Sequence, residues 1–294
     1  MKPKHWAVFF LLSLIWGASF LWIKIAVQEV GPLTLVTLRI FFAVLILLVF
    51  VLVRKNRPPA RRIWVPFFIQ GMFSAALPWV LISWAEKSID SALATVLNAT
   101  VPLFTLIIAH FFVEEDRISL SRIFGLLLGF MGVVVLVHKD LEVLLGPDSG
   151  GLDLAFFGKV AMILASLCYG ISNVYAKVKF RNIPPVQQAF FTLLLADAVM
   201  WMTAPFIEAP FTLPSKPLTW IAILWLGFLG AGISYLMFYA LLQAIGPTRV
   251  SLITYVIPVI GVTLGVLFLK ERLDWSLAVA AILIVAGVWA VNRK

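Results

Sequence analysis

The sequence is poor in charged residues, cysteine and histidine. Only 13% of its 294 residues are charged and 62% are hydrophobic, whereas about a quarter of a soluble domain is charged. This composition excludes an ordinary globular enzyme, a disordered chain and a nucleic-acid-binding protein. The single cysteine, Cys168, lies in an apolar stretch, so no disulfide within the chain and no cysteine-based metal site is expected. The three histidines are dispersed and lack the spacing of a metal site.

Long apolar stretches take the place of these residues. A helix that crosses a bilayer needs about 20 apolar residues, and the chain supplies ten such stretches. They are Trp6–Ala26, Leu33–Val53, Ile63–Ala85, Ser91–Val113, Ile123–Val137, Leu154–Lys177, Val186–Ile207, Leu218–Leu242, Arg249–Leu269 and Ser276–Val291. Short connections rich in proline, glycine and charge separate them. We therefore predict an all-α integral membrane protein with ten transmembrane helices.

The basic residues predict how these helices are oriented. Segments on the cytoplasmic side of membrane proteins carry an excess of lysine and arginine. Placing the N-terminus in the cytoplasm puts 15 of them in cytoplasmic segments and 6 in external ones, with Arg39 and Lys159 inside helices. We expect a multi-pass protein of the cytoplasmic (inner) membrane with both termini in the cytoplasm.

The two halves of the chain repeat each other. Ser13–Lys24 matches Ser166–Lys177 at an offset of 153, and Pro102 matches Pro258 at an offset of 156. These matches predict two five-helix repeats, residues 1–139 and 153–294. Because five is odd, the second repeat enters the membrane from the opposite side, and the repeats are inverted.

Inverted repeats are typical of secondary transporters, which bind their substrate at the repeat interface near the bilayer midplane. A duplicated structural membrane protein is the less favoured alternative. An intramembrane enzyme is disfavoured because the chain lacks convergent catalytic groups. A channel would need a ring of like residues or a carbonyl filter, usually from an oligomer. We therefore predict a carrier without enzymatic activity, cofactor or metal.

Motifs in both halves resemble the EamA domains of the drug/metabolite transporter superfamily. They are Leu14–Phe20 with Lys24, Leu38-Arg39, Pro102, Glu114-Glu115, Tyr169-Gly170, Pro258 and Lys270–Leu273. The resemblance implies a ten-helix bacterial protein that exports amino acids or other small metabolites. One difference from the family pattern is that Arg39 has no basic counterpart, since its repeat partner is Thr192.

Polar and aromatic residues inside the apolar stretches are the candidate substrate ligands. Trp79 and Tyr235 are repeat partners, and so are Asn98 and Thr254. Amide and phenol groups are costly in lipid and should face inward. We predict that one central cavity is lined by Trp79, Asn98, Tyr169, Asn173, Tyr235, Tyr239 and Tyr255. Helix packing and the interfacial aromatic belt are the alternatives.

Two prolines and a few deep charges complete the candidates. Pro102 and Pro258 each remove a backbone donor in the middle of a span, which predicts a helix break in each repeat. Asp197, near the middle of the seventh span, is a candidate for proton coupling, although it could instead pair with Lys159. Arg39 is expected to brace helices. Glu86 is expected to be solvated or to guard the vestibule.

The shortage of deep charge disfavours a strongly anionic substrate, which would require a clamp of arginine and lysine. We predict that the carrier exports small amphipathic metabolites such as amino acids. The alternative substrate is a hydrophobic cationic drug, held by aromatic faces. The expected partners are this small molecule and the lipid bilayer, and no nucleic acid is expected. The sequence is compatible with a monomer.

Overall fold

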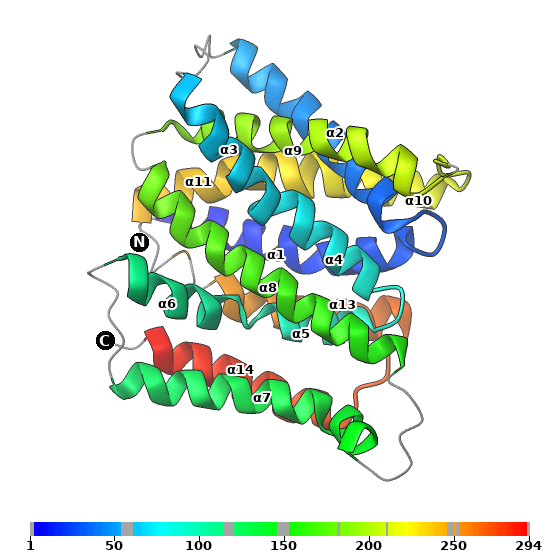
Figure 1. The fold of residues 1–294 in the computed structure, drawn as a ribbon, viewed down its shortest axis with the longest axis vertical. Helices are drawn as coiled ribbons and strands as arrows, with labels where there is room; N and C mark the ends of the chain where they lie inside the picture. Colours follow the sequence, from blue (N-terminus) through cyan, green and yellow to red (C-terminus); the bar gives the residue numbers. More distant parts are fainter. Residues whose placement is uncertain are drawn as a thin grey trace.

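The computed structural model describes residues 3–53, 61–113, 120–145, 153–180, 183–209, 211–245, 250 and 253–292. The regular elements in these residues are helices. Some of them follow one another end to end within one candidate membrane span, and each such span, whether one helix or several, is called a rod; the rods form a bundle (Figure 1). Seven rods are long and apolar enough to cross a membrane, and three shorter apolar helices bring the number to ten. The predicted all-α membrane architecture is confirmed.

The first five rods begin with two uninterrupted helices, α1 and α2. The third rod contains a short 3-10 turn and a π-helical segment, and the fourth consists of two α-helices. Their bounds are α1 (Pro3–Ala26), α2 (Pro32–Val53), η1 (Arg61–Ile63), α3 (Trp64–Gly71), η2 (Met72–Ala76), α4 (Leu77–Ala85), α5 (Ser91–Asn98), α6 (Val101–Phe112) and α7 (Leu120–Leu145). The helix α7 runs eight residues beyond the predicted end at Val137.

The second five rods follow the same plan. The eighth rod again contains a π-helical segment, at the position that corresponds to the one in the third rod. The bounds are α8 (Leu154–Lys179), α9 (Pro185–Ile207), α10 (Pro217–Leu224), η4 (Trp225–Ile233), α11 (Ser234–Ile245), α13 (Ile253–Leu269) and α14 (Trp275–Asn292). π-Helical segments are rare and occur frequently at functional sites. The π-helical segments therefore indicate a functional region in the third rod of each half, that is, in the third and eighth rods of the chain.

The course of the chain shows the inversion. Both termini lie on the same side of the bundle, as an even number of rods requires (Figure 1). The helix α1 runs away from that side, whereas α8, its counterpart, runs back toward it. The helices α7 and α14 pack side by side at one edge of the bundle.

Close helix contacts obey the same repeat relation. A Cβ on Gly17 would lie 2.7 Å from Ile260, and a Cβ on Gly170 would lie 2.9 Å from Phe104. Gly17 and Gly170 are repeat partners, and so are Phe104 and Ile260. Each repeat therefore inserts its first helix against the fourth rod of the other repeat. Small residues permit this approach because no side chain separates the helices.

The second contact of this kind joins the π-helical rods to α2 and α9. A Cβ on Gly71 would lie 2.5 Å from the carbonyl oxygen of Thr192, and a Cβ on Gly227 would lie 3.0 Å from that of Arg39. Both glycines and both carbonyls are related by the repeat. The residues around Gly71 and Gly227 thus hold the repeats together at equivalent depths.

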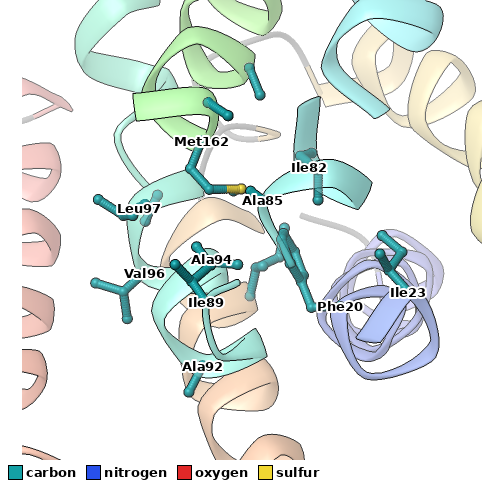
Figure 2. Close-up of a cluster of buried hydrophobic side chains, with 14 of the residues drawn as sticks. Phe20, Ile23, Ile82, Ala85, Ile89, Ala92, Ala94, Val96, Leu97 and Met162 are labelled. Atoms are coloured by element: carbon teal, nitrogen blue, oxygen red, sulfur yellow. The ribbon is translucent and has the colours of Figure 1, made fainter. Parts of the chain in front are cut away.

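An apolar cluster fills the bundle between α1, α4, α5 and α8. Figure 2 shows Phe20 and Ile23 of α1 close to Ile82 and Ala85 of α4, with Met162 of α8 beside them. All five side chains are buried. The cluster surrounds the end of α4 with hydrocarbon and therefore sets a low-dielectric environment for Glu86, the next residue along the chain.

The two prolines lie in different surroundings. The helix α5 ends at Asn98 and α6 begins at Val101, so Pro102 lies in the first turn of a new helix. Proline is favoured there because the first turn needs no backbone donor from it. Pro258 instead lies inside the uninterrupted helix α13. The fourth and ninth rods therefore differ, although their sequences correspond.

Candidate functional site

The repeat partners Trp79 and Tyr235 touch each other. Their rings are 5.9 Å apart between centroids and meet edge to face, with an interplanar angle of 80°. Both side chains are buried. Two residues that exchange places under an approximate two-fold rotation meet only close to the rotation axis. This contact therefore marks the repeat interface, where secondary transporters of this architecture bind substrate.

Further phenol groups extend this pair into a cluster. Tyr239 lies one helical turn beyond Tyr235, with ring centroids 5.9 Å apart. The Tyr235 hydroxyl donates a 2.7 Å hydrogen bond to the backbone carbonyl of Ser74. Tyr169 on α8 is hydrogen-bonded to the Trp79 side chain. The structure thus brings together four of the seven predicted ligands: Trp79, Tyr169, Tyr235 and Tyr239.

Two of the other predicted ligands, Asn98 and Asn173, lie outside this cluster. Asn98 ends α5 and is partly buried, and its Oδ1 has no hydrogen-bond partner. Asn173 is exposed, and its amide donates to the Thr105 hydroxyl at 3.4 Å. The side chain of Tyr255 lies outside the described residues. Both asparagines lie where α8 packs against the fourth rod, as the bond from the Ser166 hydroxyl to the Leu97 carbonyl shows.

Arg39 belongs to the aromatic cluster. Its guanidinium carbon lies 3.8 Å above the centre of the Trp79 ring, a cation–π contact. The side chain is only 5% exposed. Its Nη2 donates a long 3.5 Å bond to the Gly230 carbonyl, and its Nε has no partner. No carboxylate of the described residues forms an ion pair with it. Arg39 therefore carries a buried charge whose hydrogen-bonding capacity is largely unused.

One face of the third rod continues from Trp79 toward Glu86. Trp79, Ser83 and Glu86 follow at intervals of four and three residues, which places them on a single helical face. All three are buried. The Ser83 hydroxyl and both carboxyl oxygens of Glu86 lack hydrogen-bond partners. The expectation that Glu86 is solvated is therefore wrong, because its side chain is fully buried next to the apolar cluster of Figure 2.

The electrostatic surroundings of Glu86 include three charged groups. Burial raises the pKa of Glu86 well above its ordinary value, Glu271 acts in the same direction, and Lys24 and Arg39 partly oppose the shift. The Lys24 ammonium is held by two carbonyls, those of Glu86 and Ile89, each at 2.8 Å. An approaching cation would favour the ionised form of this carboxyl group.

A second group of buried polar atoms lies between α3, η2 and α9. Asp197 is buried, and its Oδ1 has no partner. The same holds for Gln70 Oε1, Ser74 Oγ and Thr192 Oγ1. These residues lie near the crossing at Gly71, whose Cβ would touch Ala196, the neighbour of Asp197. Sequence reasoning identified Asp197 but not the unpartnered polar atoms near this crossing, of which those of Gln70 and Ser74 lie on the facing rod and that of Thr192 lies on α9 itself.

Three glutamates bind helix N-termini of the opposite repeat at the end of the bundle where α1 ends. Glu208 accepts bonds from the backbone N–H groups of Leu33 and Thr34, and Glu271 accepts bonds from those of Ser91 and Ala92. These bonds are 2.8–2.9 Å long. Free N–H groups and the helix dipole favour a carboxylate at this position. Glu208 and Glu271 therefore fasten one repeat to the other.

Glu29 makes the corresponding bonds from the first repeat to the second. It accepts from the backbone and hydroxyl of Ser215, from Lys216 N–H and from the Thr219 hydroxyl. These donors, the Ser215 and Thr219 hydroxyls first, lower the pKa of Glu29 from 4.5 to about 2. A neighbouring pocket of about 380 Å³ is lined by Lys24, Glu29, Asp90, Lys216 and Glu271, among others.

Substituting Glu29→Gln is expected to lower the unfolding temperature of the detergent-solubilised protein by a few degrees. The carboxylate is stabilised in the folded state, so its contribution is complete above pH 4.5 and is lost as the pH falls through about 2. The deficit of the variant should therefore be constant from pH 8 to pH 5 and shrink in more acidic buffer. The exposed neighbour Gln28, replaced by alanine, serves as the control. A deficit that grows on acidification would contradict this assignment.

The inverted rods, the symmetric interface and the buried polar cluster define a membrane transport protein. The chain belongs to the EamA-like transporter family, whose model matches it twice, over residues 5–138 and 156–293. This places it in the drug/metabolite transporter superfamily, among transporters without enzymatic activity.

Several relatives cover most of the chain. The transporter YoaV of Bacillus subtilis is 26% identical over 95% of this chain and 93% of its own length. The inner membrane transporter YedA of Escherichia coli K12 is 28% identical over 87% and 80%. A crystal structure of another protein superposes with a TM-score of 0.69 at 22% identity, covering 99% of this chain and 98% of that one. That likeness concerns the fold alone.

Proposed function

We propose that the protein is an alternating-access carrier that exports small amphipathic metabolites, such as amino acids, across the cytoplasmic membrane. The observation that carries this proposal is the contact between the repeat partners Trp79 and Tyr235, with the unpaired Arg39 charge stacked on it. Aromatic rings with polar handles suit amphipathic solutes. The export direction is taken from the family resemblance.

Hydrophobic cations, the alternative substrates, are less well matched to this cluster. They would be drawn to aromatic faces, but the Trp79 face already bears the Arg39 guanidinium. A second positive charge beside it would be repelled in a low-dielectric interior. We therefore favour amino acids over quaternary amines.

Transport by the purified protein in liposomes tests the function. We expect saturable counterflow of at least one amino acid from a panel of all twenty, and no ionic conductance. Conductance would instead identify a channel. Saturable counterflow of quaternary amines, with no amino acid transported, would replace the proposed substrate class by the alternative.

We further propose that the repeats span residues 1–139 and 153–294, that both termini are cytoplasmic, and that the end of the bundle bearing Glu208 and Glu271 faces outward. The proposal rests on the excess of lysine and arginine at the opposite end. Labelling of single-cysteine variants in whole cells tests it. A cysteine at position 148 that reacts only from the cytoplasm would overturn the orientation.

The predicted ligands remain part of this proposal. Trp79, Tyr169, Tyr235 and Tyr239 would form the wall of the binding site, and Asn98, Asn173 and Tyr255 would line its approach. Asp197 would carry a coupling proton, since it is buried with an unpartnered oxygen. Pro102 and Pro258 would position the fourth and ninth rods beside the path.

The Asn98→Leu variant is expected to transport substrate about ten-fold less efficiently, while its membrane level stays normal. Its Oδ1 has no partner in the protein, so the substitution removes capacity for a solute hydrogen bond at similar side-chain size. Counterflow at several concentrations measures the change in kcat/KM. The exposed Leu127→Ala substitution on α7 is the control. Unchanged kcat/KM in Asn98→Leu would leave Asn98 as a packing residue.

A further inference from the structure

A buried guanidinium and a buried carboxyl group lie in the same part of the bundle without forming an ion pair. Arg39 belongs to α2 and Glu86 follows α4, and each is close enough to feel the charge of the other. Neither forms an ion pair with a described residue, and Arg39 Nε and both Glu86 oxygens have no hydrogen-bond partner. Buried charges in proteins are normally paired and hydrogen-bonded, because desolvation is costly. Both groups therefore lack hydrogen-bond partners that a bound ligand would supply.

The third rod sets the spacing between the two groups. The guanidinium of Arg39 is stacked over Trp79 at 3.8 Å. Glu86 lies seven residues after Trp79 on the same face, which corresponds to a rise of about 10 Å along the helix. Ser83 lies between them, and its hydroxyl also has no partner. The face thus presents, in order, a cation, a hydroxyl and a carboxyl group.

The neighbouring cation does not satisfy this carboxyl group. Lys24 directs its ammonium to the backbone carbonyls of Glu86 and Ile89, not to the Glu86 carboxyl oxygens. Glu271 acts on Glu86 as a like charge, and it acts in the same way on Asp90. A ligand ammonium at the Glu86 end would therefore meet the acidic groups Glu86 and Glu271 beside a Lys24 ammonium that is already bound to backbone carbonyls, whereas at the Arg39 end it would meet a cation alone.

We infer that Arg39 and Glu86 bind the two poles of a zwitterionic amino acid. The Arg39 guanidinium donates to the substrate carboxylate, for which its planar fork is suited. The Glu86 carboxylate accepts from the substrate ammonium, and the Ser83 hydroxyl lies between the poles. The rings of Tyr169 and Tyr235 contact the side chain. This inference rests on the proposed function and specifies which amino-acid groups are recognised.

Three related solutes test the recognition of the substrate carboxylate and of the substrate ammonium separately. Phenylalanine has both, phenethylamine lacks the carboxylate, and 3-phenylpropionate lacks the ammonium. Uptake of each into liposomes containing the wild-type protein is compared with uptake by Glu86→Gln, Arg39→Lys and Arg39→Gln. We expect the wild type to prefer phenylalanine to either analogue by about ten- to hundred-fold in kcat/KM, the range of a charge-assisted hydrogen bond.

Each substitution should remove discrimination at one pole only. Glu86→Gln is expected to lose the preference for phenylalanine over 3-phenylpropionate and to keep the preference over phenethylamine. Arg39→Gln is expected to show the reverse, and Arg39→Lys to retain part of the carboxylate preference. Because these are ratios within one preparation, they do not depend on how much protein folds. The exposed residues Arg272 and Asp274, changed to glutamine and asparagine, are the matched controls.

An internal ion pair between Arg39 and Glu86, formed in another conformation, would give a different result. Glu86→Gln and Arg39→Gln would then each lower the transport of all three solutes by the same factor, and this result would overturn the inference. Equal transport of phenylalanine and phenethylamine by the wild type would also overturn it, while leaving the proposed function intact. If no amino acid of the full panel is transported, the proposed function itself has failed.

Discussion

Replacing Trp79 by alanine is expected to destabilise the folded protein by about 3–5 kcal/mol and to abolish measurable transport. The side chain is 3% exposed and contacts Tyr235, Arg39 and Tyr169. Truncation of a buried tryptophan leaves a cavity of this cost. It also removes the aromatic face from a buried guanidinium, which has few other partners.

Two further variants show which part of the loss in stability and transport comes from the buried position of Trp79 and which part comes from its aromatic ring. Trp84 lies on the same helix but is 38% exposed, so Trp84→Ala should cost far less and leave transport intact. Trp79→Phe keeps an aromatic face for Arg39 but loses the bond to Tyr169, and should retain part of the stability. Unfolding temperature in detergent and counterflow in liposomes measure both properties. Equal losses in Trp79→Ala and Trp84→Ala would show that the position near the two-fold axis has no special role.

The sequence was sufficient to predict the membrane-spanning rods and the inverted-repeat relation between the two halves. Apolar length locates helices in a membrane because the bilayer imposes it. The offsets of 153 and 156 identified Trp79 and Tyr235 as partners. That they touch could not be deduced, because an offset relates positions by symmetry without giving their distance from the axis. Gly71 and Gly227 show the same limit, since their partners lie on other helices.

The polar part of the site was harder to predict. Glu86 follows the last apolar residue of its span, a position that in most membrane proteins is solvated. It is buried because apolar side chains such as Phe20 of α1, Ala85 of α4 and Met162 of α8 gather at the end of α4, which is a property of packing and not of the local sequence (Figure 2). Arg39 was visible as a deep charge, but its stacking on Trp79 depends on how α2 and α4 cross. The cross-repeat bonds of Glu208 and Glu271 likewise depend on which helix N-termini lie opposite.

The helix break in the fourth rod shows how a local rule and the tertiary structure interact. Pro102 removes a backbone donor, and the chain responds by ending α5 and starting α6 around it. The same residue type at position 258 is accommodated within α13. The two repeats are thus equivalent in sequence pattern but not in local conformation.

Substitution of alanine for Gly71 is expected to destabilise the protein, although alanine is the better helix former by about 1 kcal/mol. The added Cβ would lie 2.5 Å from the Thr192 carbonyl oxygen, a backbone atom that cannot move aside without displacing α9. Overpacking of this kind costs about 1–3 kcal/mol. Gly227→Ala should behave similarly, because its Cβ would lie 2.6 Å from Phe42 and 3.0 Å from the Arg39 carbonyl.

Gly230→Ala provides the control for these two variants. Its Cβ would lie 3.2 Å from the Ser19 hydroxyl, a side-chain atom, and its nearest backbone neighbour, the Trp225 carbonyl oxygen, would be at the ordinary contact distance of 3.7 Å. We expect its unfolding temperature to be close to that of the wild type. Thermal unfolding in one detergent compares all three, and Gly71→Leu should fail to reach the membrane in folded form. If Gly71→Ala were as stable as Gly230→Ala, the rods would not be held together at the Gly71 crossing, and the symmetric glycines would have to owe their role to something other than close packing.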